Sequence, residues 1–273
     1  MQNSAPSVYV IGDVHGHRRE LAAALRTAGL VDCGAHWSGG DSVLVFLGDF
    51  VDRGPEGVAV IELVMRLSEE AAEAGGRITA LLGNHEILAL GMYLFGEQEV
   101  PSDFGPRSFA RSWRLNGGLE ADQEAMTTDQ VAWLSALPAL ALEADHLLMH
   151  SDTVEYFGWG ETIAEINEGV RAVLQGSDIR AWWDCWRRMT TRYAFRGEYG
   201  QRLAEEVLGR LGGNMIVHGH SVIAEALGVA AEDVHEPLYY AGDKVVDVDG
   251  GLFIGGPCLI VRLGDHRLVS ARH

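Results

Sequence analysis

Residues 43–54 read VLVFLGDFVDRG, a short apolar run that ends in a glycine and is followed by two aspartates and an arginine. An apolar run of this length, bounded by glycine, is typical of a buried strand. In layered α/β folds, ligands bind just beyond the carboxyl ends of the strands. The stretch therefore predicts a strand over residues 43–49 that presents Asp49 to a binding site, followed by a turn that carries Asp52 and Arg53.

The same arrangement recurs four more times along the chain. The other stretches read VYVIGDVHG at 8–16, ITALLGNHE at 78–86, HLLMHSD at 146–152 and MIVHGHS at 215–221. The polar residues that they place at or just beyond the strand ends are Asp13, His15, Asn84, His150 and His220. Carboxylate, amide and imidazole groups are typical metal ligands. A metal site formed by five strand ends at one sheet edge is therefore expected.

Helical patterns separate the first strands. They cover residues 20–28, 55–74, 86–94 and 129–137, and Pro55 and Gly75 mark the two ends of the longest. Alternating strands and helices predict an α/β fold with a largely parallel central sheet. Short apolar runs after His220 predict a second, more antiparallel sheet, with strands at 245–248, 252–254, 258–263 and 267–271.

Residues 96–125 and 155–195 interrupt this alternation. The first segment is rich in arginine and turn-forming residues. The second has a mostly helical pattern and carries Trp159, Trp182, Trp183 and Trp186. We expect these segments to form a mostly helical cap over the site. Tryptophans in such a cluster are more often core residues than a binding surface, and both interpretations stay open. No linker or repeat divides residues 1–273, so a single domain is expected.

The composition disfavours several classes of partner. The formal net charge is −18, whereas nucleic acids and anionic membranes bind clustered lysine and arginine. A small phosphorylated ligand stays possible, because a few arginines and metal ions can dominate a pocket.

Cys33, Cys185 and Cys258 have no paired spacing and predict buried, reduced thiols in a cytoplasmic protein. We identify no signal peptide and no apolar run as long as a membrane span.

The ordered combination of GDVHG, GDFVDRG and GNHE is far more specific than any one of these motifs. It resembles the calcineurin-like metallophosphoesterases, and among them the bacterial PPP-type serine/threonine protein phosphatases. The resemblance implies a four-layer αββα sandwich with central β-sheets. It also implies a metal-dependent phosphomonoester hydrolase with two divalent metal ions, for which manganese is favoured and iron or zinc is possible.

The resemblance assigns a role to each polar residue. Asp13, His15 and Asp49 would hold the first ion. The second ion would be held by Asp49, Asn84, His150 and His220. A hydroxide that bridges the ions would attack phosphorus, and Asp49 can bridge them because a carboxylate has two oxygens. His85 would protonate the leaving oxygen while Asp52 orients its ring. Arg53 and Arg196 would bind the phosphate, and Arg196 is assigned from the Arg-Gly pair that it forms with Gly197.

The stretch MIVHGHS offers two histidines that face the same way in a strand. In the phosphoprotein phosphatases, glycine precedes a single histidine ligand. Gly219 precedes His220 here, which favours His220. His218 is left as a supporting residue or an additional ligand.

Several functions are compatible with this site. The substrate would be a phosphopeptide or a small phosphorylated molecule. Ser151, Asp152 and Thr153 replace glycine of the relatives, which together with the cap disfavours a shallow groove for protein. An alternative is symmetrical diadenosine tetraphosphate hydrolysis, although Glu86 is more typical of the monoesterases. A catalytically inactive phosphate-binding module is a remote alternative, because every ligand and the acid are retained.

Overall fold

The computed structural model describes residues 5–101, 105–264 and 267–272, and it contains two five-stranded sheets. The strand order of the first sheet is β10-β9-β1-β2-β3. Its members are β1 (Val8–Ile11), β2 (Val43–Phe46), β3 (Arg77–Ala80), β9 (Cys258–Arg262) and β10 (Arg267–Arg272). Strands β1, β2 and β3 are parallel, while β9 is antiparallel to both β1 and β10.

The second sheet has the strand order β4-β5-β6-β8-β7. Its members are β4 (Leu140–Glu143), β5 (His146–Met149), β6 (Met215–His218), β7 (Leu238–Tyr240) and β8 (Val245–Asp247). The three central strands are parallel, and an antiparallel strand flanks them on each side. In both sheets, the parallel strands therefore bring their carboxyl ends to one edge.

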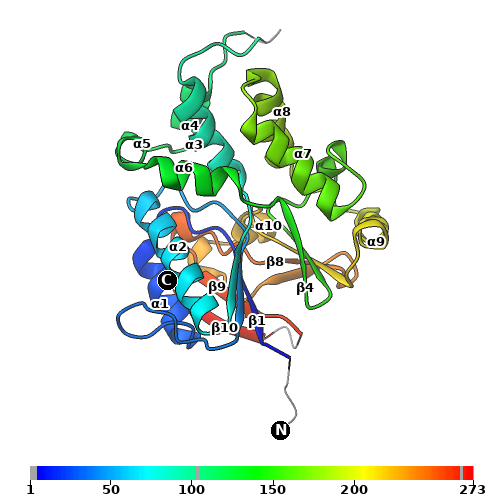
Figure 1. Ribbon diagram of the computed structural model, residues 1–273. Helices are drawn as coiled ribbons and strands as arrows, with labels where there is room; N and C mark the ends of the chain where they lie inside the picture. Colours follow the sequence, from blue (N-terminus) through cyan, green and yellow to red (C-terminus); the bar gives the residue numbers. More distant parts are fainter. Residues whose placement is uncertain (1–4, 102–104, 265–266, 273) are drawn as a thin grey trace.

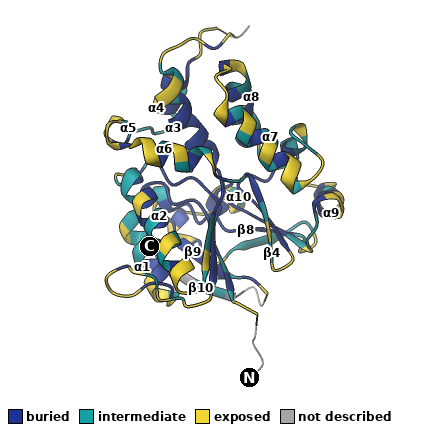
Figure 2. Ribbon diagram, viewed as in Figure 1, coloured by how far each residue is buried: buried dark blue, intermediate teal, exposed yellow. Residues whose placement is uncertain are grey.

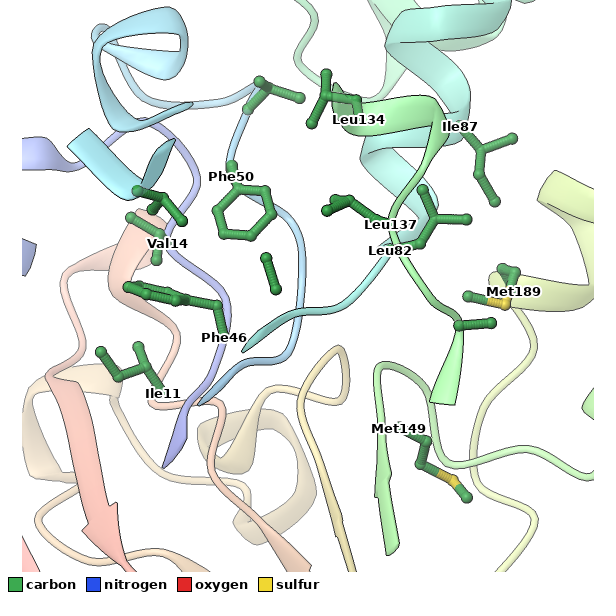
Figure 3. Packing of buried hydrophobic residues seen from close by; sticks show 14 of the residues in the cluster. Ile11, Val14, Phe46, Phe50, Leu82, Ile87, Leu134, Leu137, Met149 and Met189 are labelled. Carbon is green, nitrogen blue, oxygen red and sulfur yellow. The ribbon is translucent and has the colours of Figure 1, made fainter. Parts of the chain in front are cut away.

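Alternate residues of the central strands pack on opposite sides. Val43 and Val45 of β2 belong to an apolar cluster that also contains Val217 of the second sheet. Leu44 and Phe46 belong to a cluster shared with the helices, and Figure 3 shows Phe46 near Phe50. Both faces of β2 are therefore buried, which explains why its sequence is continuously apolar.

Helices cover the outer faces of the two sheets. Helices α1 (Arg18–Thr27) and α2 (Gly57–Glu73) pack against the first sheet. Helices α7 (Ile163–Gln175) and α9 (Gly200–Leu211) contact the second (Figure 1). The order helix, sheet, sheet, helix confirms the predicted αββα sandwich. The sheets are mixed rather than largely parallel.

The C-terminal strands do not form a sheet of their own, so that prediction is wrong. Strands β9 and β10 extend the first sheet, and β7 and β8 extend the second. Residues 252–254, predicted as a strand, form a short 3-10 helix. The glycines on each side, Gly251 and Gly255, have φ angles of 74° and 90°, which turn the chain there.

A layer of helices lies above the edge that carries the predicted ligands (Figure 1). It consists of α3 (Asn84–Phe95), α4 (Phe109–Leu115), α5 (Glu120–Ala125), α6 (Thr128–Ser135), α7 and α8 (Ile179–Met189). The Trp182 ring of α8 packs against Phe95 with centroids 5.7 Å apart. Figure 2 shows that the faces of these helices turned toward one another are buried and the opposite faces exposed. Residues 155–195 are therefore mostly helical, as expected, whereas the described part of residues 96–125 contributes only the short helices α4 and α5 to the layer.

The three cysteines are unpaired, but only Cys185 and Cys258 are buried. Cys33 is exposed, because it lies in a loop after α1 and not in an apolar element. The prediction that all three thiols are buried is therefore wrong for Cys33. In the part of the chain that the structure describes, no helix combines the length and apolarity needed to cross a membrane.

Candidate metal centre

The six predicted metal ligands meet at the carboxyl ends of the parallel strands. They follow β1, β2, β5 and β6, or begin α3 directly after β3. None is more than 7% exposed, and the six are Asp13, His15, Asp49, Asn84, His150 and His220. Residues separated by more than 200 positions in the sequence therefore form one buried polar cluster.

Asp49 lies at the middle of this cluster. Its Oδ2 is 3.6 Å from Nε2 of His15, and its Oδ1 is 3.5 Å from Nε2 of His150. The side-chain oxygen of Asn84 is 2.9 Å from that same His150 nitrogen. One carboxylate thus faces imidazoles on both sides, as a bridging ligand would.

The potential ligands form two groups that share Asp49. One group contains Asp13, Asp49, His150 and His220, and the other contains His15, Asp49 and His85. Asp13 is thus placed with His150 and His220 as well as near His15, whose Nε2 is 3.8 Å from Oδ2 of Asp13. A hydrogen bond holds Asp13 near His220, because the backbone N–H of His220 donates to Oδ1 of Asp13. Sequence spacing did not predict this proximity, nor the place of His85 in the second group.

Five residues of the site have left-handed backbone conformations. Their φ angles are 45° at His15, 54° at Asp49, 66° at Asp52, 68° at Arg53 and 64° at His220. Such a conformation costs on the order of 1–3 kcal/mol in a residue other than glycine and is concentrated at functional sites. The backbone N–H of His15 donates to the carbonyl of Asp49 at 2.8 Å, which helps to hold two of these turns together.

Glu86 organises the backbone around Asp49, a role that the sequence analysis missed. It is fully buried, and its carboxylate accepts hydrogen bonds from the backbone N–H groups of Asp49, Phe50 and Gly83 at 2.8–2.9 Å. Burial raises the pKa of Glu86 to about 7, against the effect of these three donors. The available signal was its position three residues after Gly83, where a glutamate can cap a helix.

The electrostatics and shape of the cluster fit bound cations. Burial raises the pKa of Asp13 and Asp49 well above the usual range, and each is raised further by a neighbouring carboxylate. Burial also lowers the pKa of His150 to about 3, which keeps that ring neutral. Neutral imidazoles can donate lone pairs to a metal, and crowded carboxylates need positive charge nearby.

Two further observations agree with a metal site. Nε2 of His15 is buried and has no hydrogen-bond partner among the described residues. A Cβ atom at Gly83 would lie 2.1 Å from Oδ1 of Asp49, and one at Gly219 would lie 2.4 Å from Oδ1 of Asp13. Glycine is thus required at both positions for the carboxylates to lie where they do. The nitrogen and oxygen donor set suits divalent manganese, iron or zinc.

His85 and Asp52 form a buried pair beside this cluster. Nδ1 of His85 lies 2.7 Å from Oδ2 of Asp52, and the indole N–H of Trp113 donates to Oδ1 at 2.8 Å. Arg53 lies within 3.1 Å of Nε2 of His85, and its guanidinium carbon is 4.0 Å from the ring centroid of Phe253. A proton on Nδ1, facing Asp52, leaves Nε2 as an acceptor for Arg53.

The described side-chain contacts of Arg196 are with Asp247 and with aromatic rings. Its Nη2 is 3.9 Å from Oδ2 of the buried Asp247, and its guanidinium carbon is 4.2 Å from the ring centroid of Tyr193. Burial lowers the pKa of His218 and raises that of Asp247, and the positive charge of Arg196 makes a smaller contribution that lowers both. A phosphate-binding role for Arg196 stays a prediction.

Arg192, four residues earlier, was not identified from the sequence. The pKa values of His85, His150 and His220 are lowered mainly by burial, and the Arg192 charge adds to the effect at each of the three. Tyr193 follows with a φ of 72°, which turns the chain between the two arginines. The Arg-Gly pair drew attention to Arg196, whereas no local pattern distinguishes Arg192.

His218 belongs to neither group of potential ligands. Its Nε2 lies 2.7 Å from the hydroxyl of Tyr240, which is 3.3 Å from Oδ2 of Asp152. Asp152 also accepts from Ser221 at 2.6 Å and from the backbone of Tyr193 at 2.9 Å. These contacts favour a supporting role for His218. Asp152 is fully buried and connects three segments, so its side chain does not line an open groove.

The fold and the ligand cluster define a class of α/β protein with a metal centre at the meeting edges of two sheets. The family model of the calcineurin-like phosphoesterases matches residues 6–224. The chain belongs to this family.

Three comparisons illustrate the relationship. The chain is 41% identical over 78 residues to Shewanella-like protein phosphatase 2 of Arabidopsis thaliana, covering 29% of this chain and 20% of the relative. It is 30% identical over 174 residues to the symmetrical bis(5'-nucleosyl)-tetraphosphatase of Bordetella parapertussis, covering 64% and 53%. A cold-active protein tyrosine phosphatase of a psychrophilic Shewanella has the same fold, with a TM-score of 0.73, 23% identity and coverage of 97% and 77%. The chain thus spans about half or less of these two curated relatives.

Proposed function

We propose that this protein is a metal-dependent phosphomonoester hydrolase with a dinuclear metal centre. The position of Asp49 carries the proposal, because its two oxygens face His15 on one side and His150 on the other. A shared carboxylate between two sets of nitrogen and oxygen donors is the arrangement that two-metal hydrolases require. The residues that would hold the ions are Asp13, His15, Asp49, Asn84, His150 and His220. Manganese is the favoured metal, with iron or zinc as alternatives.

The bound ions would supply a nucleophilic water and neutralise charge on the phosphoryl oxygens. The protein residues would perform the remaining steps. Arg53 would move from Nε2 of His85 to the phosphate oxygens, which a guanidinium binds through paired hydrogen bonds. With Arg53 moved away, Nε2 of His85 would take up a proton from water and, with Asp52 stabilising the charged ring through Nδ1, would deliver that proton to the leaving oxygen. Arg192 is our preferred second arginine for the phosphate.

The substrate is a phosphopeptide or a small phosphorylated molecule. A hydrolysis screen with added Mn²⁺ tests this, using an aryl phosphate, phosphopeptides, sugar phosphates and nucleotides. Metal-dependent release of inorganic phosphate from a monoester is the expected result. Absence of hydrolysis with every monoester and every metal tried would contradict the proposal.

A second candidate is symmetrical dinucleoside tetraphosphate hydrolysis. The 30% identity to a protein of that name over 174 residues favours it. Glu86, the last residue of the motif GNHE, favours the monoesterases. Diadenosine tetraphosphate in the same screen separates the two functions, because the products would be nucleoside diphosphates and not inorganic phosphate.

A further inference from the structure

A groove lies in the helical layer that covers the metal centre (Figure 1). It is a cavity of about 340 Å³ between α4 and α8, and we call it the cap groove. Leu115, Trp183 and Trp186 give it apolar surface, and Arg107, Arg111 and Ser112 give it hydrogen-bond donors. No role has been assigned above to any of these six residues.

Ring contacts between the two helices hold the cap groove in shape. The ring of Phe109, on α4, packs against Trp183 of α8 with centroids 5.3 Å apart. Trp183 in turn packs against Trp186 at 4.7 Å. Interlocked aromatic rings of this kind keep the walls apart at a fixed distance. The cap groove is therefore a preformed feature of the fold.

The two helices that border the cap groove, α4 and α8, each contact the candidate site through residues within about one helical turn of the groove. On α8, Trp186 accepts a backbone hydrogen bond from Thr190, whose carbonyl is 3.1 Å from Nε2 of His220. At the end of α4, Leu115 is two residues before Gly117, whose carbonyl accepts the backbone N–H of Arg53 at 2.7 Å. A substrate with its phosphate on Arg53 would therefore extend into the cap groove.

The cap groove has the opposite charge from the chain as a whole. The net charge of the chain is −18, yet two arginines and no acidic residue are among the described residues that line this cavity. Arg111 makes one weak hydrogen bond, to the carbonyl of Pro106 at 3.4 Å. Nε1 of Trp186 is buried and has no acceptor among the described residues. A ligand that fits must bring negative charge together with apolar surface.

A second cavity continues the cap groove away from the metal centre. It measures about 180 Å³, shares Arg107 and Arg111 with the first, and adds Glu97 and Glu99. It lies farther out because α3 leads away from Asn84 over 12 residues, about 18 Å, before the chain returns through α4. The two cavities form an elongated track, with Leu115 toward the metal centre, Arg107 and Arg111 where the cavities meet, and Glu97 and Glu99 farther out. Such a track suits an extended chain better than a compact metabolite.

We infer that the cap groove binds the polypeptide next to the phosphorylated residue of an acidic phosphopeptide. An apolar side chain next to the phosphorylated residue would pack on Leu115 and Trp183, and an acidic side chain slightly farther along the peptide would pair with Arg111. Basic residues would be accepted only farther along, near Glu99, because the Glu97 carboxylate pairs with Arg114. This inference rests on the proposed phosphomonoesterase function.

Phosphopeptides with acidic, neutral or basic residues beside one phosphoserine test the inference. We expect the wild-type enzyme to prefer the acidic over the basic peptide by at least about tenfold in kcat/KM, and Arg111→Glu to abolish or reverse that preference. Leu115→Glu should reduce it too, and both residues are exposed, so folding should be retained. The matched control, Arg202→Glu on exposed α9, should keep the wild-type preference.

Two results would overturn the inference. One is equal hydrolysis of the three peptides. The other is faster hydrolysis of a nucleotide or dinucleoside tetraphosphate than of any peptide, with the same dependence on Arg111. An aryl phosphate in the same assay keeps the two proposals apart. If the enzyme hydrolyses the aryl phosphate but shows no preference among the peptides, only the inference about the cap groove is contradicted. If it does not hydrolyse the aryl phosphate at all, the proposed function is contradicted.

Discussion

Oδ2 of Asp52 lies 2.7 Å from Nδ1 of His85, and both side chains are 1% exposed. The other carboxylate oxygen accepts the indole N–H of Trp113, so both oxygens of Asp52 have a partner. This contact fixes the imidazole with Nδ1 toward Asp52 and Nε2 toward Arg53. A histidine held in this way can deliver a proton from one defined nitrogen.

We expect His85→Asn to lower turnover of an aryl phosphate by about 100-fold or more, as for loss of a general acid. Metal content, measured on the same sample, should stay at the wild-type level if His85 acts mainly as the acid. His36→Asn, at an exposed histidine, is the control and should behave as wild type. Turnover within a few-fold of wild type in His85→Asn would remove this residue from the mechanism.

The pair also predicts a pH dependence. Burial raises the pKa of Asp52 to about 7, and the hydrogen bond from Trp113 partly opposes that shift. Because the pKa is raised, Asp52 gains its proton as the pH falls through about 7 and then no longer accepts from His85. We expect kcat/KM to decline on the acidic side of about pH 7.

Trp113→Phe tests the origin of this decline. It removes the hydrogen bond that lowers the pKa of Asp52, so the acidic limb of the pH profile should move to higher pH. Trp37→Phe, whose indole N–H donates to Gly40 in an exposed position, is the control. If the acidic limb of the kcat/KM profile lies at the same pH in Trp113→Phe as in the wild type, the pKa of Asp52 does not determine that limb.

Glu86 is expected to support the fold of the site. Glu86→Leu would leave three buried backbone N–H groups without an acceptor, at about 1–3 kcal/mol each. We expect the free energy of unfolding, from urea titration, to fall by roughly 3 kcal/mol. A loss below about 1 kcal/mol would mean that water or another acceptor satisfies these groups.

The two arginines near Tyr193 can be separated by kinetics. Arg192→Ala should raise the Michaelis constant for an aryl phosphate about tenfold, through loss of a charged hydrogen bond to phosphate. Arg196→Ala, the variant that the sequence favours, should instead lower stability, because Asp247 would lose its nearest cation. A raised Michaelis constant in Arg196→Ala with no effect in Arg192→Ala would restore the prediction from the sequence.

The αββα layering was implied by the family resemblance, and the α/β class could be predicted because the apolar runs of β1, β2, β5 and β6 each lead to a polar residue. The six potential ligands could be found for the same reason. The assignment of strands to sheets could not be predicted, since β9 pairs with β1 across more than 240 residues and β10 joins the sheet through β9. No local pattern encodes a pairing at that separation.

Within the site, the missed features depend on contacts distant in sequence. The indole of Trp113 reaches Asp52 across 61 residues, and Asp152 meets Ser221 across 69. Left-handed backbone at His15, Asp49 and His220 was also unexpected, because these residue types carry a steric cost there. The surrounding hydrogen bonds offset that cost, and they exist only in the folded chain.

The central claim is that Asp49 joins two metal ions into one hydrolytic centre. Its most direct test is to strip the protein of metal, titrate Mn²⁺ back, and measure bound metal per chain and aryl phosphate hydrolysis on the same samples. We expect two ions per chain and a rate that reaches its maximum with the second, whereas Asp49→Asn should lose both metal and activity. Full activity in the stripped protein, or full metal occupancy in Asp49→Asn, would contradict the claim.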